Sequence, residues 1–256
     1  MCLILIAFDP AAEQRLVVAG NRDEFHARPT QKADWWPDAP DILGGRDLQA
    51  GGSWLAVSRA GRFAAVTNYR DAEATKRGKV SRGLLITEFL QSAATPVDYI
   101  NTIDGDGYAG FNLLVSDGNS LAYLSNRSSN FGELPPGMYG LSNATLDTPW
   151  EKVERSKGGL RELINSNSVN ETSLMRLLAD REKGPVEEAQ SDHLPFATAH
   201  AITAPFIVLP EYGTRCSTTV IMTQAGHWQF AEQRFAADGS KTGVSRHAFD
   251  QEPAGK

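Results

Sequence analysis

Four stretches of the chain consist of two apolar runs joined by a short polar turn, a pattern typical of β-hairpins. The first pairs residues 2–8 with 15–19 across the turn sequence DPAAEQ. The others are predicted over 53–69, over 111–127 with a turn at Asp117-Gly118-Asn119, and over 217–235 with a turn near Ala225-Gly226. Most of these strands are apolar at nearly every position, so we expect sheets that are covered on both faces.

Helical spacing of apolar residues is found between the hairpins. Residues 84–92 show it, with Ser81 as the expected N-cap, and so do 148–165 and 172–183, the last beginning near Asn170 or Glu171. Residues 184–200 are predicted to be a loop, and the chain after about Ala236 a poorly ordered, flexible tail. This order of elements predicts an α+β fold, a single domain over 1–256, with two packed antiparallel sheets flanked by helices.

The composition is that of an ordinary globular protein. The chain has 256 residues, of which 41% are hydrophobic and 22% charged. The net charge of −6 argues against broad nucleic-acid binding. One basic cluster interrupts the acidic balance, formed by Lys76, Arg77, Lys79 and Arg82. It is interpreted either as a solvated loop or as an anion site.

The cysteine content and the N-terminal apolar run bear on the cellular compartment that the protein occupies. Cys2 and Cys216 are the two cysteines of the chain. Two cysteines do not make a disulfide framework, so a reducing compartment is expected, although a single bridge between them stays open. The apolar run 3–8 is too short to span a membrane and lacks the flanks of a signal peptide. We therefore expect a cytoplasmic protein with no membrane span.

Cys2 stands directly behind the initiator methionine. It is interpreted either as a small hydrophobe at the start of a buried strand or as a nucleophile whose own amine is its base. The second interpretation requires removal of Met1, which is expected when a small residue follows. A free α-amine has a pKa of about 7.7–8.0 and therefore accepts a proton near neutral pH.

The sequence GNRDEFHARP at 20–29 places several charged residues where the second strand ends. Antiparallel pairing returns this strand end to the start of the first strand, so Arg22 and Asp23 should lie near Cys2. There Arg22 would lower the pKa of the thiol, and Asp23 would hold the amine. Cys2 should then react with alkylating reagents before Cys216. The alternative is a structural Arg22–Asp23 ion pair beside an inert cysteine.

These residues resemble the NRDE family, which includes the transport and Golgi organisation protein 2 group. The similarity covers nearly the whole chain, and one departure is His26, at a position associated with an aromatic residue. The matching motifs are MC at 1–2, NRDEFHARP at 21–29, GGSW at 51–54, AAVTNYR at 64–70, SRG at 81–83, GFNLL at 110–114, YGLSNATLDTPWEKV at 139–153 and YGTRCSTTV at 212–220.

The resemblance implies a four-layer αββα sandwich of the N-terminal nucleophile hydrolase type, with mostly antiparallel sheets. It implies that Cys2 is the nucleophile, with Arg22 and Asp23 beside it. Asn68 and Asn143 resemble oxyanion-site residues, and Arg215 resembles an arginine that supports the nucleophile. Each also has a structural interpretation, the asparagines as turn or backbone partners and Arg215 as part of an ion pair.

Three functions follow as expectations. The first is hydrolysis or transfer of an amide or thioester with an apolar acyl part, which needs no cofactor. The second is a haem-binding or haem-trafficking protein, or an acyl-CoA and lipid-handling protein, that uses the same cleft without catalysis. In that case Cys2 or His26 would ligate haem, and Arg22 or Arg82 would bind its propionates. The third is an interaction protein with an inactive hydrolase fold.

The five histidines lack metal-ligand spacing, so no metal is expected.

Overall fold

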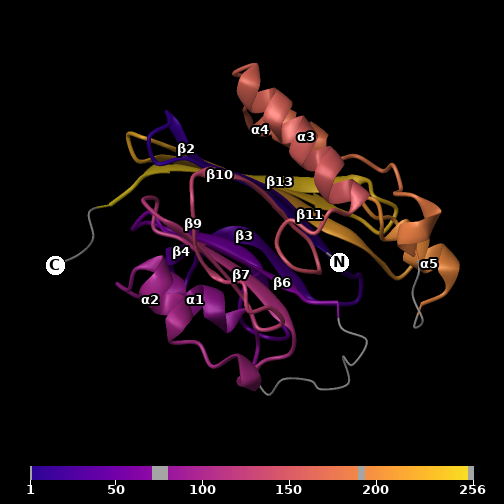
Figure 1. Cartoon of the computed structure of the whole chain (residues 1–256), viewed down its shortest axis with the longest axis horizontal. Helices are drawn as coiled ribbons and strands as arrows, with labels where there is room; N and C mark the ends of the chain where they lie inside the picture. The colour runs from indigo at the N-terminus through magenta and orange to yellow at the C-terminus, as the bar shows by residue number, and fades with distance from the viewer. Residues whose placement is uncertain (1, 71–79, 190–193, 253–256) are drawn as a thin grey trace.

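Two antiparallel sheets stack face to face in the computed structural model, and helices cover both outer faces (Figure 1). The structure describes residues 2–70, 80–189 and 194–252. In Figure 1, α3 and α4 lie above one sheet, and α1 and α2 lie below the other. This αββα arrangement confirms the predicted fold class.

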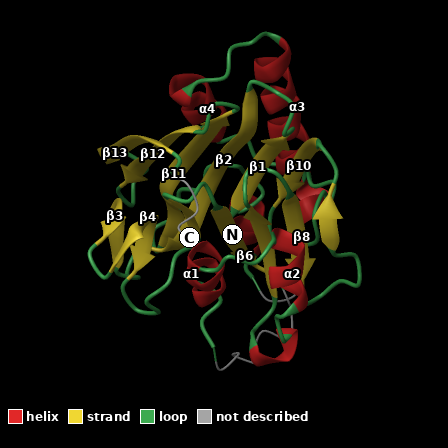
Figure 2. Ribbon diagram, turned by 90° about the vertical axis from the view of Figure 1, so that its left-hand side faces the viewer, coloured by secondary structure: helices red, strands yellow, loops and turns green. Residues whose placement is uncertain are grey.

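The first sheet has six strands in the order β10-β1-β2-β11-β12-β13, seen side by side in Figure 2. The strands are β1 (Leu3–Phe8), β2 (Gln14–Phe25), β10 (Gly137–Leu141), β11 (Tyr212–Thr223), β12 (His227–Phe235) and β13 (Lys241–Asp250). β1 therefore lies inside the sheet, with β2 on one side and β10 on the other.

The second sheet has seven strands in simple chain order. They are β3 (Thr30–Trp36), β4 (Ala39–Asp47), β5 (Leu55–Ser58), β6 (Phe63–Asn68), β7 (Phe111–Ser116), β8 (Leu121–Ser125) and β9 (Gly132–Leu134). The helices are α1 (Leu84–Gln91), α2 (Pro96–Asn101), α3 (Glu151–Asn165), α4 (Glu171–Leu178) and α5 (Phe196–Ala201), with 3₁₀ turns at Gly105–Gly107 and Val186–Ala189. No helix in the described ranges is both long and apolar enough to cross a membrane.

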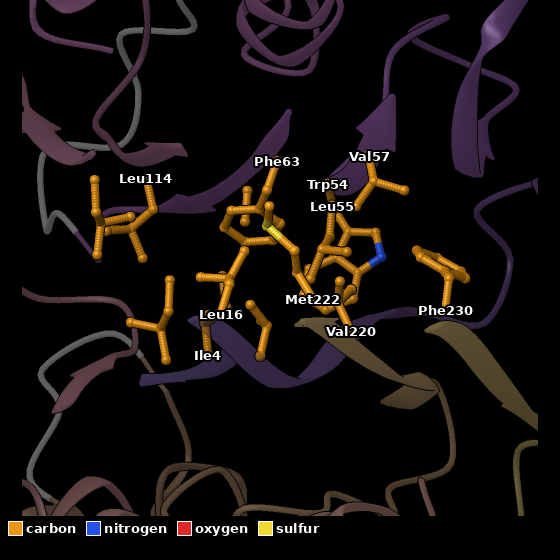
Figure 3. Close-up of a cluster of buried hydrophobic side chains, with 14 of the residues drawn as sticks. Ile4, Leu16, Trp54, Leu55, Val57, Phe63, Leu114, Val220, Met222 and Phe230 are labelled. Atoms are coloured by element: carbon orange, nitrogen blue, oxygen red, sulfur yellow. The ribbon is translucent and has the colours of Figure 1, made fainter. Parts of the chain in front are cut away.

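The apolar core lies in three layers between the four layers of secondary structure. The middle layer joins the two sheets and includes Ile4, Trp54 and Phe230 (Figure 3). Strand β1 sends Ile4 and Ile6 into this layer, and it sends Leu3 and Leu5 toward α3 and α4. A strand buried on both faces must be apolar at every position, which explains the uninterrupted run at the N-terminus.

The predicted hairpins are all present, and the three predicted helices exist with different ends. α3 begins at Glu151 rather than at 148, and α4 ends at Leu178 rather than at 183. The N-cap of α1 is Gly83 rather than Ser81, whose carbonyl accepts a hydrogen bond from the Leu84 nitrogen at 3.1 Å. Asn170 caps α4 as expected.

Two predictions about the last third of the chain were wrong. The tail after Ala236 is not a flexible end, because residues 241–250 form β13, which pairs along its length with β12. The inward-facing positions of β13 include the polar residues Ser245 and His247, while Val244 and Ala248 are exposed, so the strand shows no apolar face in the sequence. The predicted loop 184–200 contains α5 and a 3₁₀ turn. The basic residues Lys76, Arg77 and Lys79 lie outside the described residues, and Arg82 lies within them.

Candidate functional site

Strand register brings Cys2 between two residues that are distant in sequence. Leu3 pairs with Asn21 on β2, and Ile4 pairs with Leu141 on β10, so the next positions carry Arg22 and Asn143 toward Cys2. The Cys2 backbone nitrogen donates to Oδ1 of Asn143 at 2.8 Å. Ser142 Oγ donates to the Cys2 carbonyl at 2.7 Å. Two neighbouring residues after β10 thus hold both backbone groups of Cys2.

The hydrogen bonds of Asn143 also orient Asn68. Since Asn143 Oδ1 accepts from the Cys2 nitrogen, Nδ2 of Asn143 is the donor. It donates to the carbonyl of Asn68 at 2.8 Å and to Oδ1 of Asn68 at 2.9 Å. Both amide hydrogens of Asn143 are therefore used, and the amide donors of Asn68 point away from it. Among the described residues no acceptor takes a hydrogen bond from Nδ2 of Asn68.

A cavity of about 140 Å³ opens beside Cys2 at one end of both sheets. Its lining includes Cys2, Arg22, Asp23, Asn68 and Arg82, which the sequence analysis selected. The other described lining residues are Glu24, Arg28, Thr30, Gly45, Arg46, Asp47, Ala50, Gly52, Ser53, Trp54, Val66, Thr67, Ser81 and Gly83. Charged groups dominate this lining, which differs from the apolar pocket expected for an apolar acyl group.

Arg22 is held at the cavity wall by several partners. Its side chain is 7% exposed, and Nη1 donates to Thr30 Oγ1 at 3.0 Å. Its Nη2 lies 3.6 Å from Oδ2 of Asp47 and 3.9 Å from Oε2 of Glu24. Arg28 shares both carboxylates, with Nε 2.6 Å from Asp47 Oδ2. The two guanidinium groups and the two carboxylates form one ion-pair network beside the thiol.

Asp23 is buried behind Cys2. Its carbonyl lies 4.0 Å from Cys2 Sγ, and its Oδ1 accepts from Thr214 Oγ1 at 2.6 Å. Burial raises the pKa of the Asp23 carboxyl to about 6, although Lys152 and the Thr214 hydrogen bond oppose the shift. The carboxyl is thus mostly ionised at neutral pH and mostly protonated below pH 6.

Both cysteines are buried free thiols in the structure, so the Cys2–Cys216 bridge left open above is not formed. Burial raises the pKa of the Cys2 thiol, and the smaller effect of Arg22 does not reverse it. Arg22 lowers this pKa as expected, but desolvation of the thiolate outweighs the attraction, so the net shift is upward. Burial and Glu232 raise the pKa of Cys216 well above its ordinary value.

Three predicted residues are absent from the described lining of the cavity: Asn143, which contacts Cys2 directly, Arg215 and His26. Arg215 is the bulged residue of β11, and its Nη1 donates to the carbonyls of Phe25 and Arg28 at 2.8 and 3.2 Å. It supports the turn that follows β2 rather than Cys2 itself. The His26 ring is 3.1 Å from the carbonyl of Leu209, and His26 is absent from the described lining. Of the two alternative haem ligands, Cys2 lines the cavity and His26 does not.

Lys152 is a site residue that sequence analysis missed. It is 1% exposed, its Nζ donates to the Ile202 carbonyl at 3.1 Å, and its charge acts on both Asp23 and Cys2. Burial lowers the pKa of this ammonium, and Asp23 and Cys2 oppose that shift. The available signal was periodicity, since Lys152, Ser156 and Leu160 recur every four residues on the buried face of α3.

Known sequences match this chain along nearly its whole length. The family model described as Transport and Golgi organisation 2 matches residues 1–237. A Transport and Golgi organization protein 2 homolog from Bos taurus is 34% identical over 276 residues, covering 97% of this chain and 99% of the relative. The Homo sapiens homolog is 34% identical over 260 residues, covering 91% and 92%. The Drosophila melanogaster protein is 27% identical over 275 residues, covering 96% and 94%.

Two solved structures show the same fold at low sequence identity. One is the Caenorhabditis elegans ortholog of N-acylethanolamine-hydrolyzing acid amidase, with a TM-score of 0.51 and 12% identity over 87% of this chain and 93% of that one. The other is a conjugated bile acid hydrolase from Clostridium perfringens, with a TM-score of 0.51 and 8% identity over 100% and 99%. At such identities the likeness concerns the fold alone.

Proposed function

The chain belongs to the Transport and Golgi organisation 2 family, and we propose that it is a cysteine-dependent amide or thioester hydrolase with Cys2 as its nucleophile. The observation that carries the proposal is the contact between the Cys2 nitrogen and Asn143 Oδ1, beside a cavity that contains Cys2. A buried backbone N–H needs an acceptor at any residue, so the support comes from the combination of this contact with a cavity that the Cys2 residue itself lines.

The reaction requires removal of Met1, which converts the Cys2 nitrogen from a peptide nitrogen into an amine. The amine takes the thiol proton while sulfur forms a bond to the substrate carbonyl carbon. The carbonyl oxygen becomes an oxyanion, and collapse of the tetrahedral intermediate breaks the bond to the leaving amine or thiol, which receives that proton. Water then hydrolyses the acyl-cysteine by the same route, which restores the thiol and releases a carboxylic acid.

The hydrogen-bond network suggests separate roles for the two asparagines. Asn143 holds the Cys2 nitrogen, and its own donors are spent on Asn68. Asn68 has its Oδ1 occupied and lines the cavity, so its Nδ2 is the donor proposed for the oxyanion. Asp23, Arg22 and Lys152 set the charge around the amine and thiol.

A raised thiol pKa fits this mechanism. The thiol stays protonated at neutral pH until a base beside it takes the proton. The α-amine, with an ordinary pKa of about 7.7–8.0, is close enough to neutrality to do so. Nucleophilicity would then depend on Met1 removal rather than on a stable thiolate.

The test compares three chains with short acyl thioester and amide probes. Intact mass spectrometry should show loss of one methionine residue from the purified wild type, followed by a transient acyl adduct on Cys2. Cys2→Ala should lose at least about a hundredfold in rate, because the nucleophile is gone. A chain with one lysine inserted between Met1 and Cys2 keeps the thiol but retains an acylated nitrogen, and it should be equally inactive.

Cys216→Ser is the matched control, since it removes the other thiol from a position within β11. It should keep wild-type rates. Equal activity in the wild type and the lysine-inserted chain would refute the amine as base. If no probe is turned over, but haem binds with a Soret shift that is lost in Cys2→Ala, the binding alternative replaces the hydrolase.

A further inference from the structure

We infer that Arg82 binds an oxyanion, a carboxylate or a phosphate, in the cavity beside Cys2, and that the substrate carries such a group near the bond to be cleaved. The second half of this inference rests on the proposed hydrolase function. The first half, an anion site at Arg82, does not depend on catalysis and is tested separately.

Arg82 differs from the other arginines of the cavity in its partners. Arg28 has Asp47 at 2.6 Å, and Arg46 has Asp38 at 2.6 Å. Arg82 donates from Nη1 to the carbonyl of Gly110 at 2.9 Å, and no described carboxylate lies within ion-pair distance of it. A single carbonyl leaves most of the five guanidinium donors available to an incoming group.

The charge of Arg82 is only partly solvated. Burial lowers the pKa of Arg82, while Cys2 and Glu24 oppose that shift, and arginine still remains protonated at any physiological pH. A half-buried guanidinium with no carboxylate partner among the described residues binds an oxyanion more strongly than an exposed one, because the guanidinium has already lost part of its water.

The position of Arg82 connects the anion to the reaction. Arg82 and Cys2 line the same cavity, whose volume of about 140 Å³ suits a small group. Arg22 and Arg28 share Asp47 and Glu24, so their charges are largely balanced within the lining. An anionic group entering the cavity would therefore settle at Arg82, with its neighbouring carbonyl close to the thiol.

The test uses iodoacetate and iodoacetamide, which differ in charge but hardly in size. Both alkylate a thiol by displacing iodide, with loss of the thiol proton to solvent or base. The measured quantity is the ratio of the two rate constants at Cys2, divided by the same ratio for N-acetylcysteine at equal ionic strength. Peptide mapping separates Cys2 from Cys216, which serves as an internal reference.

We expect this normalised ratio to favour iodoacetate by about tenfold in the wild type. Arg82→Gln should bring it to about one, and Arg82→Lys should restore part of the preference. Arg161→Gln removes the same charge from an exposed position of α3 and should leave the ratio unchanged. A role confined to holding Gly110 would change stability but not the charge preference.

Competition identifies the oxyanion. Inorganic phosphate or acetate is added at constant ionic strength, with chloride as the control anion. The anion that reduces the rate of Cys2 alkylation by iodoacetate more strongly is the preferred ligand. Equal ratios in the wild type and in Arg82→Gln, with both proteins folded by circular dichroism, would overturn the anion site. If Cys2 prefers iodoacetate but no thioester or amide is hydrolysed, the anion site stands and the hydrolase proposal fails. If a probe is hydrolysed but Cys2 shows no such preference, the hydrolase proposal stands and the anion site fails.

Discussion

Asp23 keeps a carboxyl group in a place that water barely reaches. The residue is 4% exposed, and burial raises its pKa to about 6 from an ordinary value of 3.8. Thr214 and Lys152 favour the ionised form but do not compensate fully for the lost hydration. Near neutral pH the fold therefore carries a buried charge that costs stability, which is typical of functional sites.

The raised pKa of Asp23 predicts that the stability of the fold falls as the pH rises. The native state holds the Asp23 proton up to about pH 6, whereas the unfolded state releases it near 3.8. Protonation therefore stabilises the fold at low pH, and this contribution, about 3 kcal/mol, is lost as the pH rises through 6. Asn in place of Asp23 removes the titration. In urea unfolding between pH 4 and 7.5, wild type should lose stability relative to Asp23→Asn as the pH rises.

The quantity to follow is the difference in the free energy of unfolding between wild type and Asp23→Asn, because groups that titrate alike in both proteins cancel in it. The single substitution also removes the charge that faces Lys152, so the absolute stability at one pH is not informative. A difference that stays constant across the range would show that the carboxyl has an ordinary pKa in the folded protein.

Single residues also show where sequence analysis succeeds. Arg22 and Asp23 were placed near Cys2 because a hairpin fixes their register locally. Asn143 reaches Cys2 through β10, whose pairing with β1 joins residues more than a hundred positions apart, and only the family resemblance pointed to it. Lys152 was missed because a charged residue on a helix is ordinarily exposed. Arg215 was selected from the family resemblance alone, and the bulge at that position directs its side chain to the loop after β2.

At the scale of elements, β1 and α4 show how local signals and packing agree. β1 is apolar on both faces because β2, β10, the second sheet and the helices surround it. α4 is only eight residues long and buries Leu174 and Leu178 against the first sheet. Such a short helix is not stable alone, so its N-cap contributes measurably.

The cap of α4 gives a prediction of stability. Asn170 Oδ1 accepts from the Ser173 nitrogen at 3.0 Å, and Ser173 Oγ accepts from the Asn170 nitrogen at 3.0 Å. Asn170→Ala removes half of this capping box and should lower the free energy of unfolding by about 1 kcal/mol. Thr172→Ala lies in the same turn on an exposed face and should change it by less than about 0.5 kcal/mol. Urea denaturation compares the two, and equal effects would mean that the cap contributes nothing.

Three of the strands that sequence analysis missed, β3, β4 and β13, have a weak apolar pattern. β3 and β4 carry polar residues at many positions because one end of each is exposed, so neither shows a clear apolar run. β13 alternates between exposed and half-buried residues at the edge of its sheet. β3 and β13 are edge strands, and β4 lies next to β3. Strands that are partly solvated show a weaker pattern than β1 or β11.

At the scale of the whole molecule, the middle core joins the two sheets into one unit. Residues from both sheets meet in it, among them Ile4 and Phe63 (Figure 3). The cavity lies where both sheets end, with Cys2 and Arg22 from one and Asn68 from the other. Separation of the sheets would therefore destroy the site, and we expect the chain to unfold as a single domain.

Phe249 on β13 tests this coupling at the edge of the molecule. Its ring stacks on Trp228 of β12 at a centroid distance of 6.0 Å and meets Trp35 of β3 edge-on at 5.1 Å, so it contacts both sheets. Phe249→Ala should destabilise the fold by about 2–3 kcal/mol, whereas Val244→Ala on the exposed face of β13 should cost less than about 0.5 kcal/mol. Tryptophan fluorescence and far-ultraviolet circular dichroism should report one coincident urea transition in wild type and in Phe249→Ala, shifted to lower urea in the variant. A core shared by both sheets cannot be lost by one sheet alone, so two separated transitions would contradict this coupling and would mean that the sheets unfold independently.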